Sequence, residues 1–584
     1  MNVSEYIVKY LEEKKIKNVF LVTGGGMMFM VNALSKSKIR LLHNHHEQAS
    51  FFSADGYARS TSTVGVSFAT SGPGITNIVT GVMHAWHDSI PVIIFGGQSK
   101  KKETIVHTKH KKIRQLGTFE ANSVEILKPI TKFSISISKP EDIKFYLDKA
   151  FHISQTGRPG PVFLEIPLDV QSANIDNFNL NKKKYLVKKE FKKKLISSSI
   201  NKTITMLKKS KRPLVLAGYG VRASNSVKEF QVFLKKYNLP AITTQFSKDI
   251  IEYDSKFFVG HTGPKGDRAG NNIAQQADFI LIIGCSLHSQ TIGWEKELFA
   301  PKAKKIQIDA DKEVLKKDIP NINFKYNIDV KEFITAMIKS KGKRKFSKWN
   351  NNCLNYKKKY QVINEPHKRD KRKINYYDFT YKISKLLPNK TTVITDAGAA
   401  YYILGQAFRV KKNQRYIVCG SHGTMGYALS ASNGVSLNKK TTAVCITGDG
   451  SLMTNLHDLS CTSYNKLNVK IFLINNNGYM SIRNNQKEFF GKKTVGTDKK
   501  NGVFFPNFKK TADLFNLKYI SCKSLDSLNK IAKKIFSSTK PVIIEVFCSD
   551  TVIIPTVKSS LNKKGKLVSN PINVMFPYIN NQQK

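Results

Sequence analysis

Two oxygen-bearing side chains, Asp449 and Asn476, follow two apolar runs at a spacing that suggests a shared ligand. Asp449 follows the run TTAVCIT and Gly448, before a segment predicted to become helical near Leu452. Asn476 belongs to the Asn triplet after VKIFLI. A carboxylate and an amide oxygen suit a hard cation such as Mg²⁺, and glycines and a helix N-terminus suit a phosphate. The spacing therefore predicts one Mg²⁺ and diphosphate site, whereas Gly-Asp-Gly alone would indicate an ordinary turn.

The elements that must position these residues alternate between strand-like and helix-like segments along the whole chain. The strand-like runs of the first third are NVFLVTGG, GVSFATSGPG, PVIIFGGQ and GPVFLEIPLD; those of the middle are RPLVLAGYG, LPAITT, DFILIIGCSL and KKIQIDAD; those of the last third are TTVITDAG, TTAVCITGDG, VKIFLINNNG and PVIIEVF. Such alternation is typical of parallel sheets covered by helices. We predict three consecutive open parallel-sheet α/β domains, with ligands beyond the carboxyl ends of the strands.

Lysine-rich stretches set the expected domain limits. The apolar pattern disappears in the runs that begin at Lys182 and Lys341. We therefore expect domains at residues 1–175, 195–340 and 375–556, joined by linkers, and a tail at 557–584 without clear periodicity.

The formal net charge of +53 raises nucleic-acid binding as an alternative. The lysines are spread along the chain, however, with dense runs at Lys182 and His367 that read as linkers, and no zinc-finger or RNA-binding motif accompanies them. The seven cysteines are scattered, and neither a secretory signal nor a membrane-spanning stretch is present. We expect a cytoplasmic protein with no membrane or nucleic-acid partner.

Five further motifs complete a recognisable pattern. They are HHEQASFFSADGYAR around Glu47, TSGPG at Thr70, DSIPVIIFGGQ at Asp88, GRPGPVFLEIPLDV at Gly157 and GTMGYAL at Gly423. With the Asp449 and Asn476 motifs, they make the chain from about residue 1 to 550 resemble the thiamine-diphosphate-dependent enzymes, in the branch of the acetolactate synthase large (catalytic) subunit. The resemblance implies, in order, a pyrimidine-binding, a central and a diphosphate-binding domain.

The resemblance also implies roles for individual residues. The Mg²⁺ ligands would be Asp449, Asn476 and the carbonyl group of Gly478. The residues that contact the cofactor would be Gly398, Ala399, Gly423, Met425, Gly448, Gly450, Ser451 and Tyr479. Met425 would bend the cofactor, and the carbonyl group of Gly423 would accept from its exocyclic amine. As a lone residue, Met425 would simply indicate a core position.

Two residues are expected to act on the reaction itself. Glu47 resembles the carboxylate that shares a proton with the aminopyrimidine ring and favours its imino tautomer, whose nitrogen can remove the thiazolium proton. Gly25 resembles the glycine whose amide group faces the substrate. The alternatives are a capping or ion-paired Glu47 beside the neighbouring histidines, and an ordinary glycine turn at Gly25.

Four positions depart from the acetolactate synthase pattern. Thr118 and Phe119 stand where the branch has Phe-Gln, Leu168 stands where it has Lys, and Asn485 stands where it has the Trp that helps select the second 2-oxo acid. Each change removes cationic, amide or aromatic character from a substrate-facing position. The identity of the acceptor is therefore open.

These features together predict an enzyme that uses thiamine diphosphate and Mg²⁺ to decarboxylate a 2-oxo acid, pyruvate, and transfer the two-carbon unit to a carbonyl acceptor. The alternatives are a related carboligase or decarboxylase with another acceptor, such as a keto-sugar, and a cofactor-binding protein without catalysis. FAD also remains open, since Arg222 and Asp309 could meet a dinucleotide, but the segment GCSLHSQTIG favours a central domain without one. The resemblance implies a homodimer or homotetramer and specifies no regulatory subunit.

Overall fold

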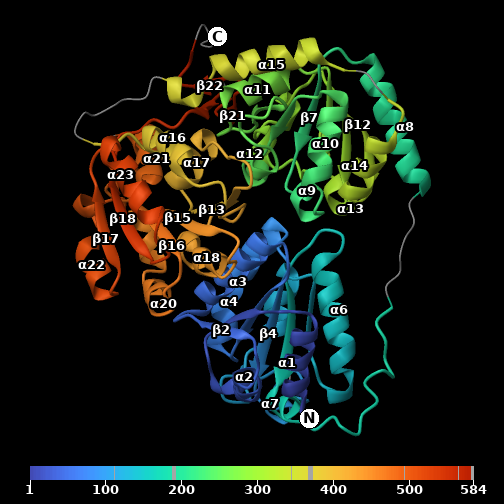
Figure 1. Cartoon of the computed structure of the whole chain (residues 1–584). Coiled ribbons are helices and arrows are strands. Elements are labelled where there is room, and N and C mark those ends of the chain that lie inside the picture. The colour runs from blue at the N-terminus through green and yellow to red at the C-terminus, as the bar shows by residue number, and fades with distance from the viewer. Residues whose placement is uncertain are drawn as a thin grey trace.

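The chain forms three parallel six-stranded sheets covered by helices (Figure 1). The computed structural model describes residues 1–110, 112–186, 193–342, 345–365, 373–491, 493–562 and 564–579. The N-terminal domain is blue to cyan in Figure 1, the central domain green to yellow, and the C-terminal domain orange to red. This arrangement confirms the predicted fold class of three α/β domains.

The N-terminal sheet has the strand order β2-β1-β3-β4-β6-β5. Its strands are β1 (Asn18–Leu21), β2 (Arg40–His43), β3 (Gly65–Ala69), β4 (Val92–Gln98), β5 (Phe133–Ser136) and β6 (Val162–Pro167). Its helices are α1 (Val3–Glu13), α2 (Met28–Ser35), α3 (Glu47–Thr61), α4 (Pro73–Asp88), α5 (Ser123–Leu127), α6 (Ile143–Gln155) and α7 (Leu168–Gln171). The four predicted strands form β1, β3, β4 and β6, whereas the edge strands β2 and β5 are additional.

The C-terminal sheet repeats this topology, with the order β14-β13-β15-β16-β18-β17. Its strands are β13 (Thr391–Thr395), β14 (Arg415–Val418), β15 (Thr442–Gly448), β16 (Val469–Asn475), β17 (Lys518–Cys522) and β18 (Val542–Phe547). Its helices are α16 (Tyr376–Leu386), α17 (Ala399–Ala407), α18 (Tyr427–Ser436), α19 (Asp449–Thr454), α20 (Asp458–Tyr464), α21 (Met480–Phe490), α22 (Phe508–Leu514) and α23 (Leu525–Phe536). The strands β15 and β16 are direct neighbours, so the residues that follow them meet at one edge.

The central sheet has a different order, β12-β11-β10-β7-β8-β9, which is that of a dinucleotide-binding fold. Its strands are β7 (Pro213–Ala217), β8 (Ala241–Thr243), β9 (Phe258–His261), β10 (Phe279–Ile283), β11 (Lys304–Asp309) and β12 (Ile322–Asn327). Its helices are α8 (Lys193–Lys209), α9 (Gly220–Ala223), α10 (Val227–Tyr237), α11 (Arg268–Gln276), α12 (Ser289–Ile292), α13 (Lys312–Leu315), α14 (Val330–Lys339) and α15 (Ser347–Lys359).

The N- and C-terminal domains are joined by close packing of α3 against α18. A side chain on Gly56 would collide with the carbonyl group of Ala431, and one on Gly434 would collide with that of Ser53. The Ser53 hydroxyl donates to the carbonyl oxygen of Ser430 at 2.8 Å. Because the two helices touch through backbone atoms, they set the relative position of the Glu47 and Gly423 segments that lead into them.

Two sequence interpretations need correction. The stretch 341–373, read as a linker, contains α15, which packs on the central domain through buried Trp349 and Cys353; the indole of Trp349 donates to the carbonyl oxygen of Pro213 at 2.9 Å. The tail, read as aperiodic, forms the antiparallel pairs β19 (Thr556–Val557) with β22 (Met575–Phe576) and β20 (Ser559–Leu561) with β21 (Leu567–Ser569).

Parts of the predicted basic linkers, residues 187–192 and 366–372, lie outside the described residues. Among the helices of the described part of the chain, none has both the length and the apolar composition that crossing a membrane requires. All seven cysteines are unpaired and buried.

Glu165 in β6 gives the N-terminal domain a stability that depends on pH. Burial raises the pKa of its carboxyl group to about 7, although contacts with the Ser136 and Ser123 hydroxyls and the Gln98 amide act in the opposite direction. The unfolded chain would lose this proton near the usual value of 4.5. The folded state therefore loses stability as the pH rises between these two values, and the loss is complete above about pH 7.

Replacing Glu165 with Gln is expected to remove this pH dependence. The free energy of unfolding should rise by about 1–3 kcal/mol at about pH 8 and change little at about pH 3, where the carboxyl group is protonated in both states. Urea unfolding of both proteins at the two pH values measures the effect. An equal shift at both values would contradict the assignment.

Candidate cofactor site

Asp449 lies at the first residue of α19, directly after β15. The helix begins three residues earlier than predicted, so the carboxylate belongs to its first turn. One carboxylate oxygen accepts from Gly450 N at 2.8 Å, and the other from Gly478 N at 2.8 Å and Asn476 N at 3.2 Å. Burial raises the pKa of Asp449 to about 6, against the effect of these backbone donors. The structure thus joins both predicted strand ends through this carboxylate.

Asn476 and Gly478 form the other half of the site. The Asn476 side chain is buried, and its amide nitrogen lies 3.6 Å from the sulfur of Met480, while its oxygen accepts no hydrogen bond from the described residues. Gly478 has φ of +94°, and a side chain there would collide with the carbonyl group of Thr497. Only glycine suits this turn, which keeps its peptide beside Asp449.

These donors fit a hard divalent cation. Within the described residues, no three His, Cys, Asp or Glu side chains gather as metal ligands. A cation at this position would instead take one carboxylate together with amide and carbonyl oxygens, and Mg²⁺ binds in this way when a diphosphate supplies further oxygens. The free side-chain oxygen of Asn476 and the buried carboxylate of Asp449, which has no ion-pair partner in the described part of the chain, match this requirement.

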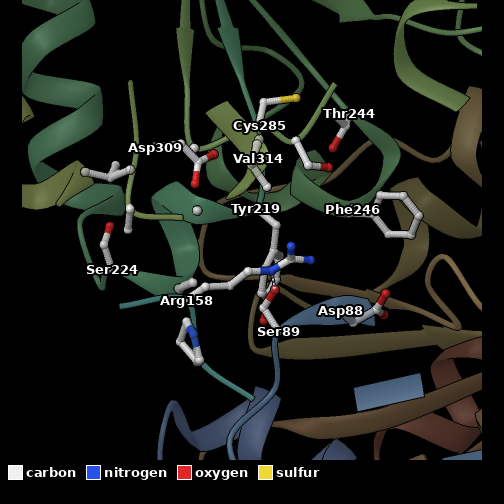
Figure 2. Close-up of a pocket in the computed structure, with 18 of the residues that line it drawn as sticks. Asp88, Ser89, Arg158, Tyr219, Ser224, Thr244, Phe246, Cys285, Asp309 and Val314 are labelled. Atoms are coloured by element: carbon white, nitrogen blue, oxygen red, sulfur yellow. Dashed lines mark hydrogen bonds between the residues drawn. The ribbon is translucent and has the colours of Figure 1, made fainter. Parts of the chain in front are cut away.

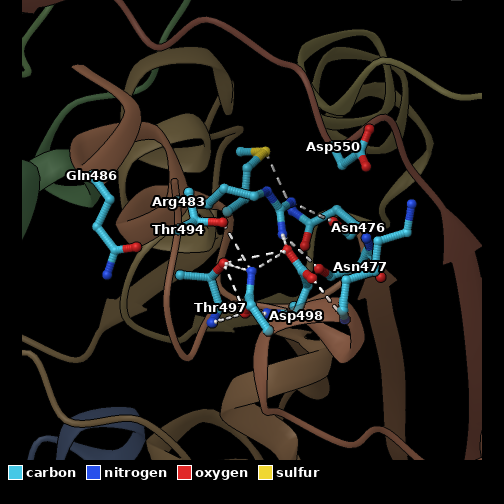
Figure 3. A network of polar contacts seen from close by, with 12 residues as sticks. Asn476, Asn477, Arg483, Gln486, Thr494, Thr497, Asp498 and Asp550 are labelled. Atoms are coloured by element: carbon cyan, nitrogen blue, oxygen red, sulfur yellow. Dashed lines mark hydrogen bonds and ion pairs between the residues drawn. The ribbon is translucent and has the colours of Figure 1, made fainter. Parts of the chain in front are cut away.

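A buried ion pair fixes the Asn476 loop from behind (Figure 3). Arg483 on α21 donates to the carbonyl oxygens of Asn477 at 2.7 Å and Asn476 at 3.1 Å, and its guanidinium lies 3.4 Å from the Asp498 carboxylate. Asp498 in turn is held by Thr497 and Asn501. The sequence interpretation missed both Arg483 and Asp498, because nothing in their local spacing connects them with the Asn triplet.

Replacing Asp498 with Asn is expected to weaken Mg²⁺ binding about tenfold without removing a ligand. Residues that orient metal ligands typically contribute 10- to 100-fold in affinity, and the neutral amide would hold Arg483 less firmly. Titration of Mg²⁺ into the protein with thiamine diphosphate measures the change. An unchanged affinity would show that the Asn476 loop keeps its shape without the ion pair.

The predicted diphosphate contacts surround this edge of the sheet. Gly398, with φ of +68°, precedes α17, and a side chain there would meet only the Ser481 hydroxyl, at 3.6 Å. Gly448 has open space where a side chain would stand, whereas Gly450 is packed under the ring of Tyr479. Ala399 starts α17 and Ser451 lies in α19, so both lie at helix N-termini that face the edge.

Asp396 is a second buried carboxyl group at this edge, which the sequence interpretation did not single out. It follows β13 in TDAG, as Asp449 follows β15, and it accepts from the Thr447 hydroxyl at 2.7 Å. Burial raises its pKa to about 6, against hydrogen bonds that include those from Thr447 and from the Ala397 backbone. Its contacts are with the protein itself, which indicates a supporting position.

Glu47 begins α3 and is largely buried. One carboxylate oxygen accepts from the Asn77 side-chain amide of α4 at 2.9 Å, and no ion pair to Glu47 occurs among the described residues. His46 caps the same helix by accepting from Gln48 N at 3.1 Å. The helix-capping role considered for Glu47 thus belongs to His46. Asn77, which the sequence interpretation missed, orients the Glu47 carboxylate.

Gly25 differs from the glycines on either side of it. Side chains on Gly24 and Gly26 would collide with Thr70 and Ser71, so these two pack the loop against TSGPG. Gly25 is exposed and has no heavy atom within 4 Å of a side-chain position. This exposed backbone suits the predicted role of facing a substrate.

The structure places three of the four divergent positions near this part of the N-terminal domain. Phe119 is 66 % exposed, and its carbonyl oxygen would lie 2.9 Å from a side chain on Gly72. The carbonyl group of Thr118 accepts from Ser99 at 2.8 Å, and Leu168 begins α7. Asn485 lies elsewhere, on the exposed side of α21 in the C-terminal domain.

The Gly423 and Met425 segment is held by the N-terminal domain. Asp88 pairs with Arg59 at 2.7 Å and accepts from Ser421 N at 3.0 Å. Burial alone would raise the pKa of Asp88, but the pairing with Arg59 lowers it. Gly423 has open space beside its backbone, and Met425 is 39 % exposed. Met425 is therefore no core residue in this chain, and its side chain is free to meet a ligand.

A separate pocket lies at the centre of the central sheet's carboxyl edge, between the loops after β7 and β10 (Figure 2). Its enclosed volume is about 120 Å³, below the roughly 300 Å³ of most ligand pockets. The Gly218 amide donates to the carbonyl oxygen of Ile283 at the end of β10, and the Gly220 amide donates to that of Gly284, both at 2.9 Å, so neither is free for a phosphate. Asp309 lines the pocket, but Arg222 is paired with Asp249 at 3.1 Å. The pocket therefore offers no free backbone donor at Gly218 or Gly220 to the phosphates of a dinucleotide.

Three family models match the chain in the order of its domains. The N-terminal TPP-binding domain of thiamine pyrophosphate enzymes matches residues 1–118, their central domain matches 200–337, and their C-terminal TPP-binding domain matches 396–546. Each model thus falls on one of the three sheets.

Several relatives resemble the chain over most of its length. The probable acetolactate synthase large subunit of Methanococcus aeolicus is 30 % identical, over 99 % of this chain and 96 % of that protein. The acetolactate synthase large subunit of Lactococcus lactis is 28 % identical, over 96 % and 95 %. The acetolactate synthase isozyme 1 large subunit of Escherichia coli is 30 % identical, over 83 % and 84 %.

Proposed function

The chain belongs to the thiamine pyrophosphate enzymes of the acetolactate synthase type, and from this premise we propose that it decarboxylates pyruvate and transfers the two-carbon unit to a carbonyl acceptor. The observation that carries the proposal is the meeting of Asp449 with the Asn476 and Gly478 amides at one sheet edge. With a second pyruvate as acceptor, the product is acetolactate.

Asp449, the Asn476 side-chain oxygen and the Gly478 carbonyl group would hold Mg²⁺, whose positive charge would favour binding of the diphosphate. The N-termini of α17 and α19 add backbone donors for the same anion. Arg483 keeps the loop in place by binding its carbonyl oxygens. Binding and orientation are the contribution of this domain.

Bound thiamine diphosphate supplies the carbanion chemistry of the reaction. Glu47 would hold a proton against the aminopyrimidine ring, and its burial strengthens that hydrogen bond because water does not compete. Asn77 orients the Glu47 carboxylate by donating a hydrogen bond from its side-chain amide to one of the two carboxylate oxygens. The donor loses its carboxyl group as carbon dioxide, a carbon–carbon bond forms to the carbonyl carbon of the acceptor, and the acceptor oxygen takes up a proton.

We also infer a homodimer or homotetramer. The exposure of Met425 and the open space at Gly25 and Gly423 support this assembly. In a dimer, these proposed cofactor contacts would face a second copy of the chain, with the cofactor between the two copies.

Product analysis tests the proposal. The purified protein is incubated with thiamine diphosphate, Mg²⁺ and pyruvate alone, and carbon dioxide and the product are measured. Acetolactate formation supports the proposed function. If carbon dioxide is released and acetaldehyde is the only product, the activity on pyruvate is decarboxylation alone. If the protein binds the cofactor but releases no carbon dioxide, pyruvate is not the donor.

A second candidate function is a carboligase with a larger acceptor. It is favoured by Asn485, which stands where the branch has a Trp and which lines a cavity of about 780 Å³. In that case, the product should appear only when a sugar-type acceptor is added to pyruvate.

A further inference from the structure

The cavity that contains Asn485 is formed by several separate parts of the chain, including the segment of Gln290 and Trp294. The loop between β9 and α11 contributes Lys265, the helices α17 and α21 contribute Tyr402, Ser481 and Asn485, and the tail contributes Lys558. Ser481 also lies beside Gly398 at the diphosphate edge, so one end of the cavity adjoins the candidate cofactor site. Its volume of about 780 Å³ is within the range of pockets for drug-sized ligands and exceeds what a three-carbon acid needs.

Lys265 is a half-buried cationic side chain of this cavity. It lies 3.4 Å from the centre of the Tyr402 ring, and it makes no ion pair within the described residues. Burial lowers its pKa to about 8, and the charge of nearby Lys558 acts in the same direction, against that of Glu488. Glu488 itself is paired with Lys558. Three lysines and three carboxylates line the cavity, but Lys265 belongs to none of the ion pairs of the described residues, which leaves it available to an anionic group of a ligand.

The backbone around Lys265 is firmly held. Its carbonyl oxygen accepts from the Gln245 amide at 2.8 Å and the Gln406 amide at 3.3 Å. Gln406 also donates to the carbonyl oxygens of Gly266 and Pro555, and Val557 N donates to that of Pro264. The lysine is thus positioned before any ligand arrives, which reduces the ordering cost of binding.

The rest of the lining suits hydroxyl groups and a ring. The side-chain amides of Asn485 and Gln290 line the cavity and make no hydrogen bonds in the described part of the chain. Trp294, 49 % exposed, and Phe489, 58 % exposed, add aromatic surface. The lining also contains carboxylates, such as Glu295, which accept from hydroxyl groups. Amides, carboxylates and aromatic faces together match a polyhydroxylated ligand better than a small acid.

We propose that this cavity is the acceptor site and that it binds a phosphorylated keto-sugar, with the phosphate on Lys265 and the hydroxyl groups on Asn485 and Gln290. The proposal rests on the two-carbon transfer proposed above and names the acceptor class of that reaction. The phosphate lies between Lys265 and Lys558, and the sugar carbon chain extends toward Ser481 and the cofactor edge.

Binding to the holoenzyme tests the proposal independently of turnover. Of the three tryptophans, Trp294 lies in the cavity, whereas Trp349 is buried elsewhere and Trp86 packs against a hydrophobic core, so a change in tryptophan fluorescence reports occupation. Fructose 6-phosphate, fructose and inorganic phosphate are titrated into protein saturated with thiamine diphosphate and Mg²⁺. We expect fructose 6-phosphate to bind at least tenfold more tightly than fructose, with inorganic phosphate as a competitor. Equal affinities for the two sugars would overturn the phosphate assignment.

Variants identify the residues. Lys265→Ala should weaken fructose 6-phosphate binding at least tenfold and Lys265→Arg should restore most of it, whereas unchanged binding in Lys265→Ala would overturn the proposal. Lys132→Ala is the control, since Lys132 is a partly buried lysine of the N-terminal domain whose pKa is also about 8. Asn485→Trp, at an exposed position, should block the cavity without disturbing the fold.

A separate measurement of carbon dioxide release from pyruvate distinguishes the two proposals. Sugar-phosphate binding without release would contradict the donor chemistry and leave the cavity assignment standing. Release without sugar-phosphate binding would contradict the cavity assignment alone.

Discussion

Replacing Glu47 with Gln is expected to lower kcat for decarboxylation of the 2-oxo acid about 10²- to 10⁴-fold, the range that a positioned proton-transfer group contributes. The amide has the same size and can still accept from Asn77, so the local structure should persist. It cannot take and return a proton at the cofactor ring. Steady-state kinetics and a titration of thiamine diphosphate measure the two effects, and the cofactor affinity should change by less than tenfold.

Glu165→Gln is a matched control, because Glu165 is another buried carboxyl group of the N-terminal domain and the change is the same. Its kcat should stay within about threefold of the original enzyme. A small effect of Glu47→Gln, no larger than that of the control, would assign Glu47 to structure rather than to proton transfer. If circular dichroism shows that Glu47→Gln does not fold, Asn77→Ala is used instead, because it tests how the Glu47 carboxylate is oriented.

The interior strands could be predicted from the sequence, and the edge strands could not. Interior strands such as β3 and β15 are covered on both faces, so they appear as continuous apolar runs. Of the six edge strands, β2, β5, β12 and β17 are partly exposed, so polar residues interrupt their pattern. The other two, β9 and β14, are mostly buried, but each has only four residues, too few for a clear apolar run. The sequence therefore indicated four strands per domain where the structure has six.

The same distinction applies to the candidate site. Asp449 and Asn476 could be found because each directly follows an apolar strand, and parallel strands bring their carboxyl ends to one edge. Asn77, Asp498 and Lys265 could not, because each meets the site through a contact with a segment distant in sequence. Asp396 is intermediate, since its place after β13 carried the same signal as that of Asp449.

Replacing Asp449 with Asn is expected to weaken Mg²⁺ binding more than 100-fold and, with it, the binding of thiamine diphosphate. The change removes the one carboxylate among the proposed ligands, so the loss should exceed the 10- to 100-fold typical of residues that only orient ligands. The change also removes a hydrogen-bond acceptor. Asp449 accepts from three backbone N–H groups through two oxygens, whereas an asparagine has a single acceptor oxygen, so at least one of these N–H groups would lose its hydrogen bond. Titration of Mg²⁺ in the presence of thiamine diphosphate measures the affinity.

Comparison with Asp498→Asn separates a ligand from its support. Both carboxylates are buried, and they flank the same Asn476 loop, but Asp498 reaches it only through Arg483. If Asp449 binds the cation, the loss of Mg²⁺ affinity in Asp449→Asn should be at least tenfold greater than in Asp498→Asn. If the two variants lose the same affinity, Asp449 acts by shaping the loop through its backbone hydrogen bonds, and the cation must be held by other oxygens at the edge.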